Sequence, residues 1–94
     1  MQNYELMLLL NPNISDEVDE ILDNIKKTIS DNKGVLEEVK LLGKRQLAYP
    51  INKMNYVNYV HLNAKINTDT LMVLEEMFKF EQNIFRHLTV KIGK

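Results

Sequence analysis

Hydrophobic and polar positions follow two different periods along this chain, and each change of period marks an element. A helix over 15–33 is predicted by five apolar residues at helical spacing: Val18, Ile21, Leu22, Ile25 and Ile29. Ser15 is its expected N-cap, and Gly34 is its expected C′ residue. A second helix follows Asn67 or Thr68 as cap, with a buried stripe of Leu71, Leu74, Met77 and Phe78.

Strand periodicity fills the remaining segments. Residues 3–10 are predicted to form a buried strand that ends at a turn containing Pro12, and from Val35 to Ile51 the period is two. Glu37 and Arg45 interrupt the apolar side of that second strand, so a bulge is expected at Gly43 between them. A polar turn at 52–55 precedes a third strand at 56–66, and the last strand is expected at 85–92.

The resulting order, β-α-β-β-α-β, predicts an α+β, ferredoxin-like fold over one domain, residues 1–94. Right-handed crossovers place both helices on one face of a four-stranded antiparallel sheet with strand order 4-1-3-2. The other face, here called the open face, has no cover. By alternation it should carry the even-numbered side of the second strand together with Met7, Leu9, Val57, Tyr59, His61, Asn63, His87 and Thr89.

Such a mixture of apolar, aromatic and cationic groups on an uncovered sheet is typical of a binding surface. Aromatic residues are enriched where proteins dock, so we expect a protein partner to contact Tyr59, His61, His87 and Lys40. The two histidines have no carboxylate of matching parity that would complete a metal site, and packing is the better interpretation.

Composition limits the class of protein. The chain has 94 residues, 45% of them hydrophobic, with no cysteine and no apolar run approaching the length of a transmembrane helix. We therefore expect a cytoplasmic protein without disulfides and without membrane contact.

Charge is unevenly distributed. Residues 1–38 have a formal charge of −6, residues 39–68 of +5 and residues 69–94 of 0, for a total of −1. The middle segment contains no Asp or Glu. A total near zero argues against nonspecific coating of nucleic acid, but a local phosphate site depends only on where the cations lie.

The most distinctive cations stand in the segment 43–52, Gly-Lys-Arg-Gln-Leu-Ala-Tyr-Pro-Ile-Asn. Lys44, Arg45 and Gln46 offer donors to phosphates and sugars, Tyr49 offers a stacking surface, and Lys53 follows closely. The alternative is a solvated edge strand whose positive charges prevent aggregation, and from the residues alone both interpretations have similar weight.

Enzyme signatures are missing from the sequence. It has no glycine-rich phosphate loop after the first strand, no Ser/His/Asp or Cys/His arrangement and no P-loop. We expect no catalysis, no cofactor, no metal and no small-molecule substrate. A small-ligand regulatory or protein-pairing module on the same fold remains the alternative function.

Together, the opening Tyr4-Glu5 strand leading into Leu10-Asn11-Pro12-Asn13, the segment 43–52 and the element order resemble the bacterial small-subunit ribosomal protein six family. That resemblance implies a structural component of the ribosome that binds the central domain of 16S rRNA together with ribosomal protein eighteen. It assigns Lys44, Arg45, Gln46 and Tyr49 to the RNA side.

Overall fold

The computed structural model describes residues 1–14, 16–51 and 53–92. Its elements follow the predicted order and are β1 (Gln2–Leu10), α1 (Asp16–Asp31), β2 (Val35–Ile51), β3 (Met54–Ile66), α2 (Thr68–Phe80) and β4 (Ile84–Ile92). The boundaries agree with the sequence within a few residues. Ser15, the expected N-cap of α1, and Asn52 lie outside the described residues.

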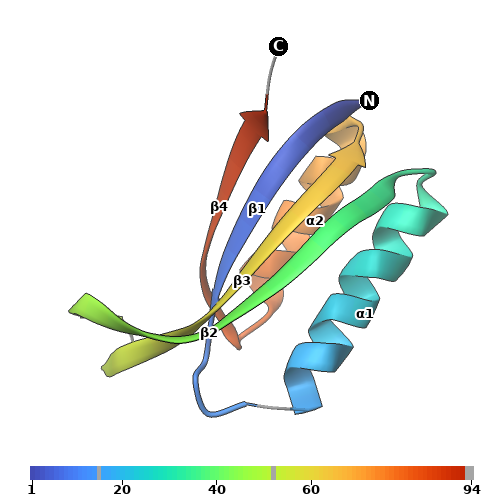
Figure 1. Ribbon diagram of the computed structural model, residues 1–94. Coiled ribbons are helices and arrows are strands. Elements are labelled where there is room, and N and C mark those ends of the chain that lie inside the picture. Colours follow the sequence, from blue (N-terminus) through green and yellow to red (C-terminus); the bar gives the residue numbers. More distant parts are fainter. Residues whose placement is uncertain (15, 52, 93–94) are drawn as a thin grey trace.

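The sheet has the strand order β2-β3-β1-β4, with antiparallel pairing at each interface, as predicted. Both helices lie on one face of it (Figure 1). The β2–β3 hairpin is longer than the other strands and extends past the helices, so its tip stands apart from the layered body.

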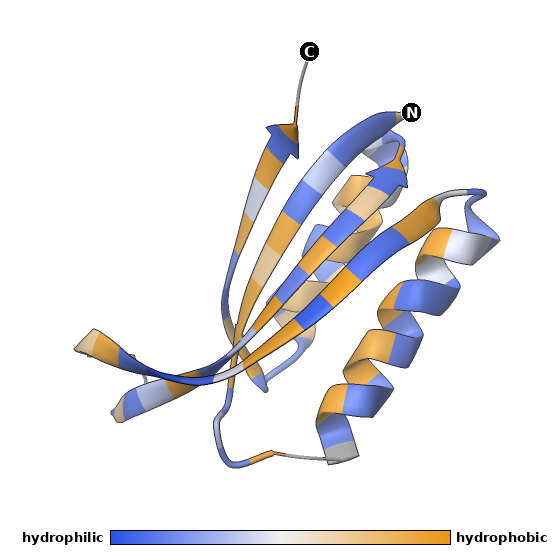
Figure 2. Cartoon of the chain, in the orientation of Figure 1, coloured by the Kyte–Doolittle hydropathy of each residue, from blue (hydrophilic) through white to orange (hydrophobic). Residues whose placement is uncertain are grey.

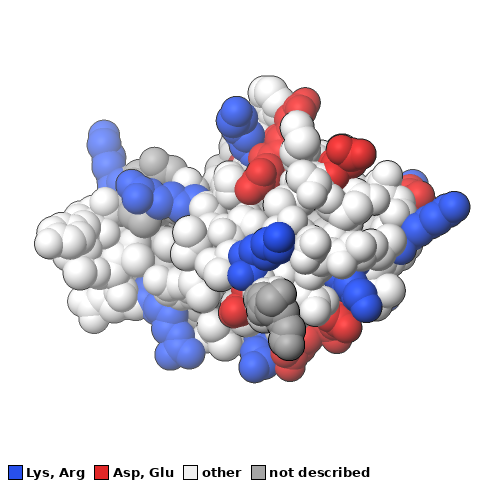
Figure 3. Space-filling view, turned by 90° about the horizontal axis from the view of Figure 1, so that it is seen from above, with Lys and Arg blue, Asp and Glu red and all other residues white. Residues whose placement is uncertain are grey.

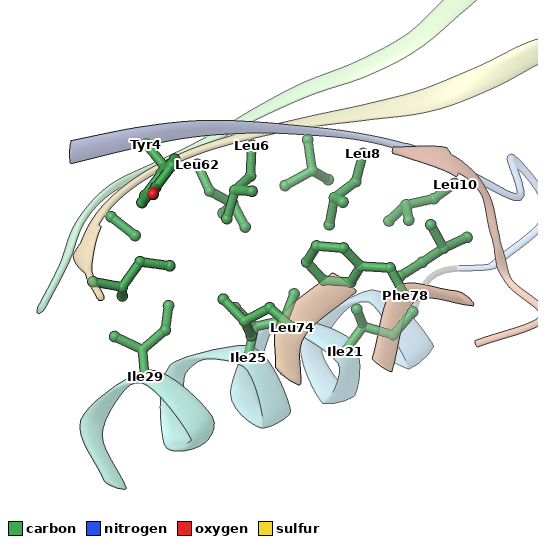
Figure 4. Packing of buried hydrophobic residues seen from close by; sticks show 14 of the residues in the cluster. Tyr4, Leu6, Leu8, Leu10, Ile21, Ile25, Ile29, Leu62, Leu74 and Phe78 are labelled. Carbon is green, nitrogen blue, oxygen red and sulfur yellow. The ribbon is translucent and has the colours of Figure 1, made fainter. Parts of the chain in front are cut away.

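The core lies between the sheet and the helices. Alternate residues of β1 point toward the helices and are buried: Tyr4, Leu6, Leu8 and Leu10. They pack against the predicted stripe of α1, including Ile25 and Ile29, and against Leu74 and Phe78 of α2 (Figure 4). The same alternation is visible as orange and blue bands along the strands (Figure 2). Each such large aliphatic residue contributes about 1.5–3 kcal/mol through burial.

The end of α1 differs in detail from the prediction. Lys33, not Gly34, adopts the left-handed conformation, with φ 64°. The Gly34 N–H donates to the Ile29 carbonyl at 2.8 Å, and the Lys33 N–H donates to the Ser30 carbonyl at 3.0 Å, which together form a Schellman motif. Gly34 is required for close approach instead, because a Cβ there would lie 2.7 Å from Ile66 Cγ2.

Irregularities in β2 occur where the sequence breaks its alternation. The register against β3 shifts between Leu41 and Gly43, and Gly43 has φ 79°, which confirms the expected bulge. The turn after β2 is shorter than predicted, because β3 begins at Met54. At the start of α2, the Asn67 side chain caps the helix by accepting from the Thr70 N–H at 2.8 Å.

The faces of β4 were predicted wrongly. Leu8, a core residue, is the register partner of His87, so His87 lies on the helix side and its ring packs against Phe78 with centroids 5.4 Å apart. Thr89 also faces the helices and donates to Glu75 of α2 at 3.1 Å. The physical reason is a register shift at Leu9/Leu10, which inserts one residue into β4 and exchanges its two faces.

Candidate RNA and protein interface

The basic residues predicted to meet RNA lie on the projecting β2–β3 hairpin. Lys44, Arg45 and Gln46 are exposed on β2, and Lys53 is exposed at the tip with φ 64°. Tyr49 is 82% exposed. The viewed face of this end of the molecule shows Lys and Arg without Asp or Glu, whereas the acidic groups gather toward the other end (Figure 3).

A second hairpin aromatic was missed by the sequence analysis. Tyr56 is the register partner of Gln46 and is 49% exposed. Its position within an acid-free span, beside a strand rich in cations, was the signal that could have identified it. Two exposed tyrosines and four polar or cationic donors therefore lie in the projecting end of the β2–β3 hairpin.

The hairpin residues do not all share one face. Lys44 pairs with Asn58, on the helix side of the sheet, whereas Arg45 pairs with Val57, on the open side. The expectation that the whole even-numbered side of β2 joins the open face is therefore correct for Glu38 and Lys40 but wrong beyond the Gly43 bulge. Val57 itself is fully buried and offers no surface.

Arg45 borders a hollow on the open face. The hollow has a volume of about 350 Å³, and Met7 of β1, Leu42 of β2 and Tyr59 of β3 line it with Arg45. The bulge thus brings a residue predicted to bind RNA against one predicted to bind a protein partner. The two surfaces meet at this hollow.

The middle of the open face is polar and internally paired. His61 Nε2 lies 2.5 Å from Glu5 Oε1, and Lys40 stands opposite His61 in the β2–β3 register. Lys40 Nζ lies 3.9 Å from Glu38 Oε2, and Asn63 donates to Glu38 Oε1 at 3.1 Å. Tyr59, His61 and Lys40 therefore lie together as predicted, and His87 does not join them.

An apolar strip completes the open face along β4. Leu88, Val90 and Ile92 are exposed there, opposite Met7, Glu5 and Asn3 of β1. The sequence analysis placed His87 and Thr89 on the open face, and so it missed these three alternating residues. The open face thus combines an apolar margin with a polar centre whose side chains contact one another.

A family model described as ribosomal protein S6 matches residues 3–91. The chain belongs to the ribosomal protein S6 family. The resemblance read from the sequence is confirmed.

Relatives of the S6 family match along the full chain. This chain is 34% identical to a small ribosomal subunit protein bS6 of Buchnera aphidicola subsp. Schizaphis graminum, and the match covers 100% of this chain and 83% of that protein. The crystal structure of 30S ribosomal protein S6 from Thermotoga maritima superposes with a TM-score of 0.86 at 29% identity, covering 97% of this chain and 87% of that one. The C-terminal domain of a Mycobacterium tuberculosis MgtC protein, at 11% identity and TM-score 0.66, shares the fold.

Membership in the S6 family makes this a ribosomal protein, and that family is structural rather than catalytic. The two histidines of this chain lie on opposite faces of the sheet. His61 is on the open face and His87 is on the helix face, so they do not converge on one ion. Within the described ranges, no three His, Asp or Glu side chains are grouped to hold a metal ion.

A hollow of about 450 Å³ lies between α2 and β4, and of the residues predicted to bind RNA or a partner it includes His87. Met72, Glu75, Glu76, Lys79, Phe80 and His87 line it, a set without a hydroxyl or thiol nucleophile. Neither described helix is long and apolar enough to cross a membrane.

Proposed function

We propose that this chain is a structural constituent of the small ribosomal subunit that binds the central domain of 16S rRNA jointly with ribosomal protein eighteen. The observation that carries the proposal is the projecting end of the β2–β3 hairpin, which concentrates cations and exposed tyrosines within the acid-free span 39–68. The protein acts by positioning RNA and partner, without chemistry of its own.

On the RNA side, Lys44, Gln46 and Lys53 donate to phosphates and sugars, and each cation that contacts phosphate releases condensed counterions. Tyr49, with most of its ring in solvent, is available to stack on an unpaired base. Because the net charge of the chain is −1, this hairpin alone would bind RNA weakly.

On the protein side, the open face offers apolar groups around paired charges. Burial of Leu88, Val90 and Ile92 by a partner would remove apolar area from water, and Tyr59 provides an aromatic contact near the hairpin. A basic partner docked here would add the positive charge that the chain lacks. The RNA would then contact a surface built by both proteins.

Charge reversal on the hairpin tests the proposal. Replacing Lys44 and Arg45 together with Glu should strongly reduce incorporation into reconstituted small subunits and lower the slope of log affinity against log salt by about 0.7–0.9 per lost phosphate contact. The matched control is Lys26→Glu with Lys27→Glu, the same charge change on exposed positions of α1. Equal incorporation of wild type and the hairpin variant across salt concentrations would refute the assignment.

A further inference from the structure

The hollow beneath Arg45 is chemically unlike the rest of the hairpin. Its lining is mostly apolar: Met7 and Leu42 share it with Tyr59, and Arg45 is the one residue of the four that carries a charge. Three strands contribute to it, so its shape is fixed by the sheet rather than by a loop. Leu42 remains 38% exposed, which leaves apolar area for an occupant to cover.

We infer that this hollow receives an aromatic side chain of the protein partner, and that Arg45 consequently serves the partner while its neighbour Lys44 serves the RNA. The inference rests on the proposed function, because it divides that function between two adjacent residues. Alternation along β2 sends their side chains to opposite faces of the sheet, and the register with Val57 and Asn58 fixes which face each takes.

The lining favours an aromatic occupant over an aliphatic one. A guanidinium at the edge of an apolar recess is attracted to the face of an aromatic ring. Tyr59 adds edge-to-face or offset-stacked contact, and the thioether of Met7 makes favourable contacts with aromatic rings. Anchors of this kind, an aromatic side chain in a pocket beside an arginine, dominate the energy of many protein interfaces.

Charge and continuity favour a protein over a nucleotide at this position. Glu5 and Glu38 lie on the same face, where His61 contacts Glu5 and Lys40 lies 3.9 Å from Glu38. A phosphate chain crossing this face would meet those carboxylates. Toward β4 the hollow continues into apolar surface, since Met7 is the register partner of Leu88. The helix-side face of the hairpin, with Lys44, is not subject to that repulsion.

A small aromatic probe tests the hollow without any ribosomal component. The full chain, with its Met and Leu methyl groups labelled for NMR, is titrated separately with N-acetyl-tyrosinamide, N-acetyl-leucinamide and uridine. We expect Met7 and Leu42 methyl signals to shift with the tyrosine derivative, at an affinity about two- to fivefold above that of the leucine derivative. Arg45→Met should remove that preference, and Arg86→Met, a control at an exposed arginine of the open face opposite Leu9, should retain it.

Absent shifts, equal affinities for the two amides, or stronger binding of uridine would each overturn the inference; the last result would assign the hollow to a nucleobase. A second measurement divides the roles in the complex. Arg45→Met should weaken binding to ribosomal protein eighteen in the absence of RNA, whereas Lys44→Met should not. If wild type failed to bind that protein while the probe result held, the proposed partner would be wrong but the aromatic pocket would stand.

Discussion

At the residue scale, the left-handed position at the end of α1 falls on Lys33 and not on Gly34, where the sequence suggests it. Lys33 takes the left-handed conformation that glycine adopts without cost, and Gly34 takes the crowded position where a side chain has no room. A Cβ on Gly34 would lie 2.7 Å from Ile66 Cγ2, 3.0 Å from Ile29 Cγ2 and 3.0 Å from the Lys65 carbonyl oxygen.

Substitutions at these two positions should therefore have opposite effects. Gly34→Ala should lower the free energy of unfolding by about 1–3 kcal/mol, because the packed neighbours must move. Lys33→Gly should raise it by up to about 1 kcal/mol, because the strained φ is relieved at the C′ position. Denaturant midpoints of the two variants measure this. A destabilised Lys33→Gly beside a neutral Gly34→Ala would contradict the assignment of the motif.

The residue scale also shows where prediction from sequence stops. The apolar stripe of α1 was predicted correctly. Rotating the helix by one residue would expose Ile25 or Ile29 to water, and that exposure costs free energy. The assignment of strand residues to the two faces of a sheet fails more easily, because one inserted residue exchanges the faces. The bulge at Gly43 was predictable because the alternation of apolar and polar residues is broken on either side of it. Nothing comparable in the sequence marked the shift opposite Leu9 and Leu10, so His87 and Thr89 were assigned to the wrong face.

At the element scale, β4 shows why a polar residue can face a helix. α2 meets this strand through a polar contact, with Thr89 donating to Glu75, and through His87 on Phe78. Its apolar residues are left for the open face, where Leu88 is 58% exposed. In a strand at the margin of the helical layer, the apolar side chains need not be the ones that the helices cover.

Alanine substitutions on β4 test that assignment. His87→Ala should destabilise the fold by about 0.5–1.5 kcal/mol, the value of an aromatic pair beyond area burial. Leu88→Ala, a larger loss of apolar side chain at the adjacent position, should change stability by less than about 0.5 kcal/mol because the side chain is mostly in solvent. Thermal unfolding of both variants under identical conditions provides the comparison. The reverse order of effects would restore the original assignment of faces.

At the scale of the whole molecule, the fold separates charge in space. The end of the β2–β3 hairpin, which lies in the acid-free span 39–68, projects from one end of the molecule, and the acidic groups of the viewed face gather toward the other end (Figures 1 and 3). The sheet divides the hairpin again, with Lys44 on one side and Arg45 on the other. A chain with a net charge of −1 thereby presents a local positive surface, which we propose meets RNA, and an open sheet face, which we propose binds a protein.

The sequence supported the family, the element order and the basic hairpin, because each depends on local patterns: periodicity, the segment 43–52 and the absence of carboxylates. The hollow under Arg45 could not be derived that way. It depends on how a bulge in β2 registers against β3 and on which residue of β1 lies beside it, and both are properties of long-range pairing.

Site-specific photocrosslinking in assembled small subunits tests most directly whether the hairpin meets RNA. A benzophenone amino acid would replace Tyr49 on the hairpin, and in a separate variant Phe80 at the end of α2, where the ring is also mostly exposed. We expect crosslinks to 16S rRNA from position 49, at a yield well above that from position 80. Subunits that contain the labelled protein but give no RNA crosslink from position 49 would contradict the account.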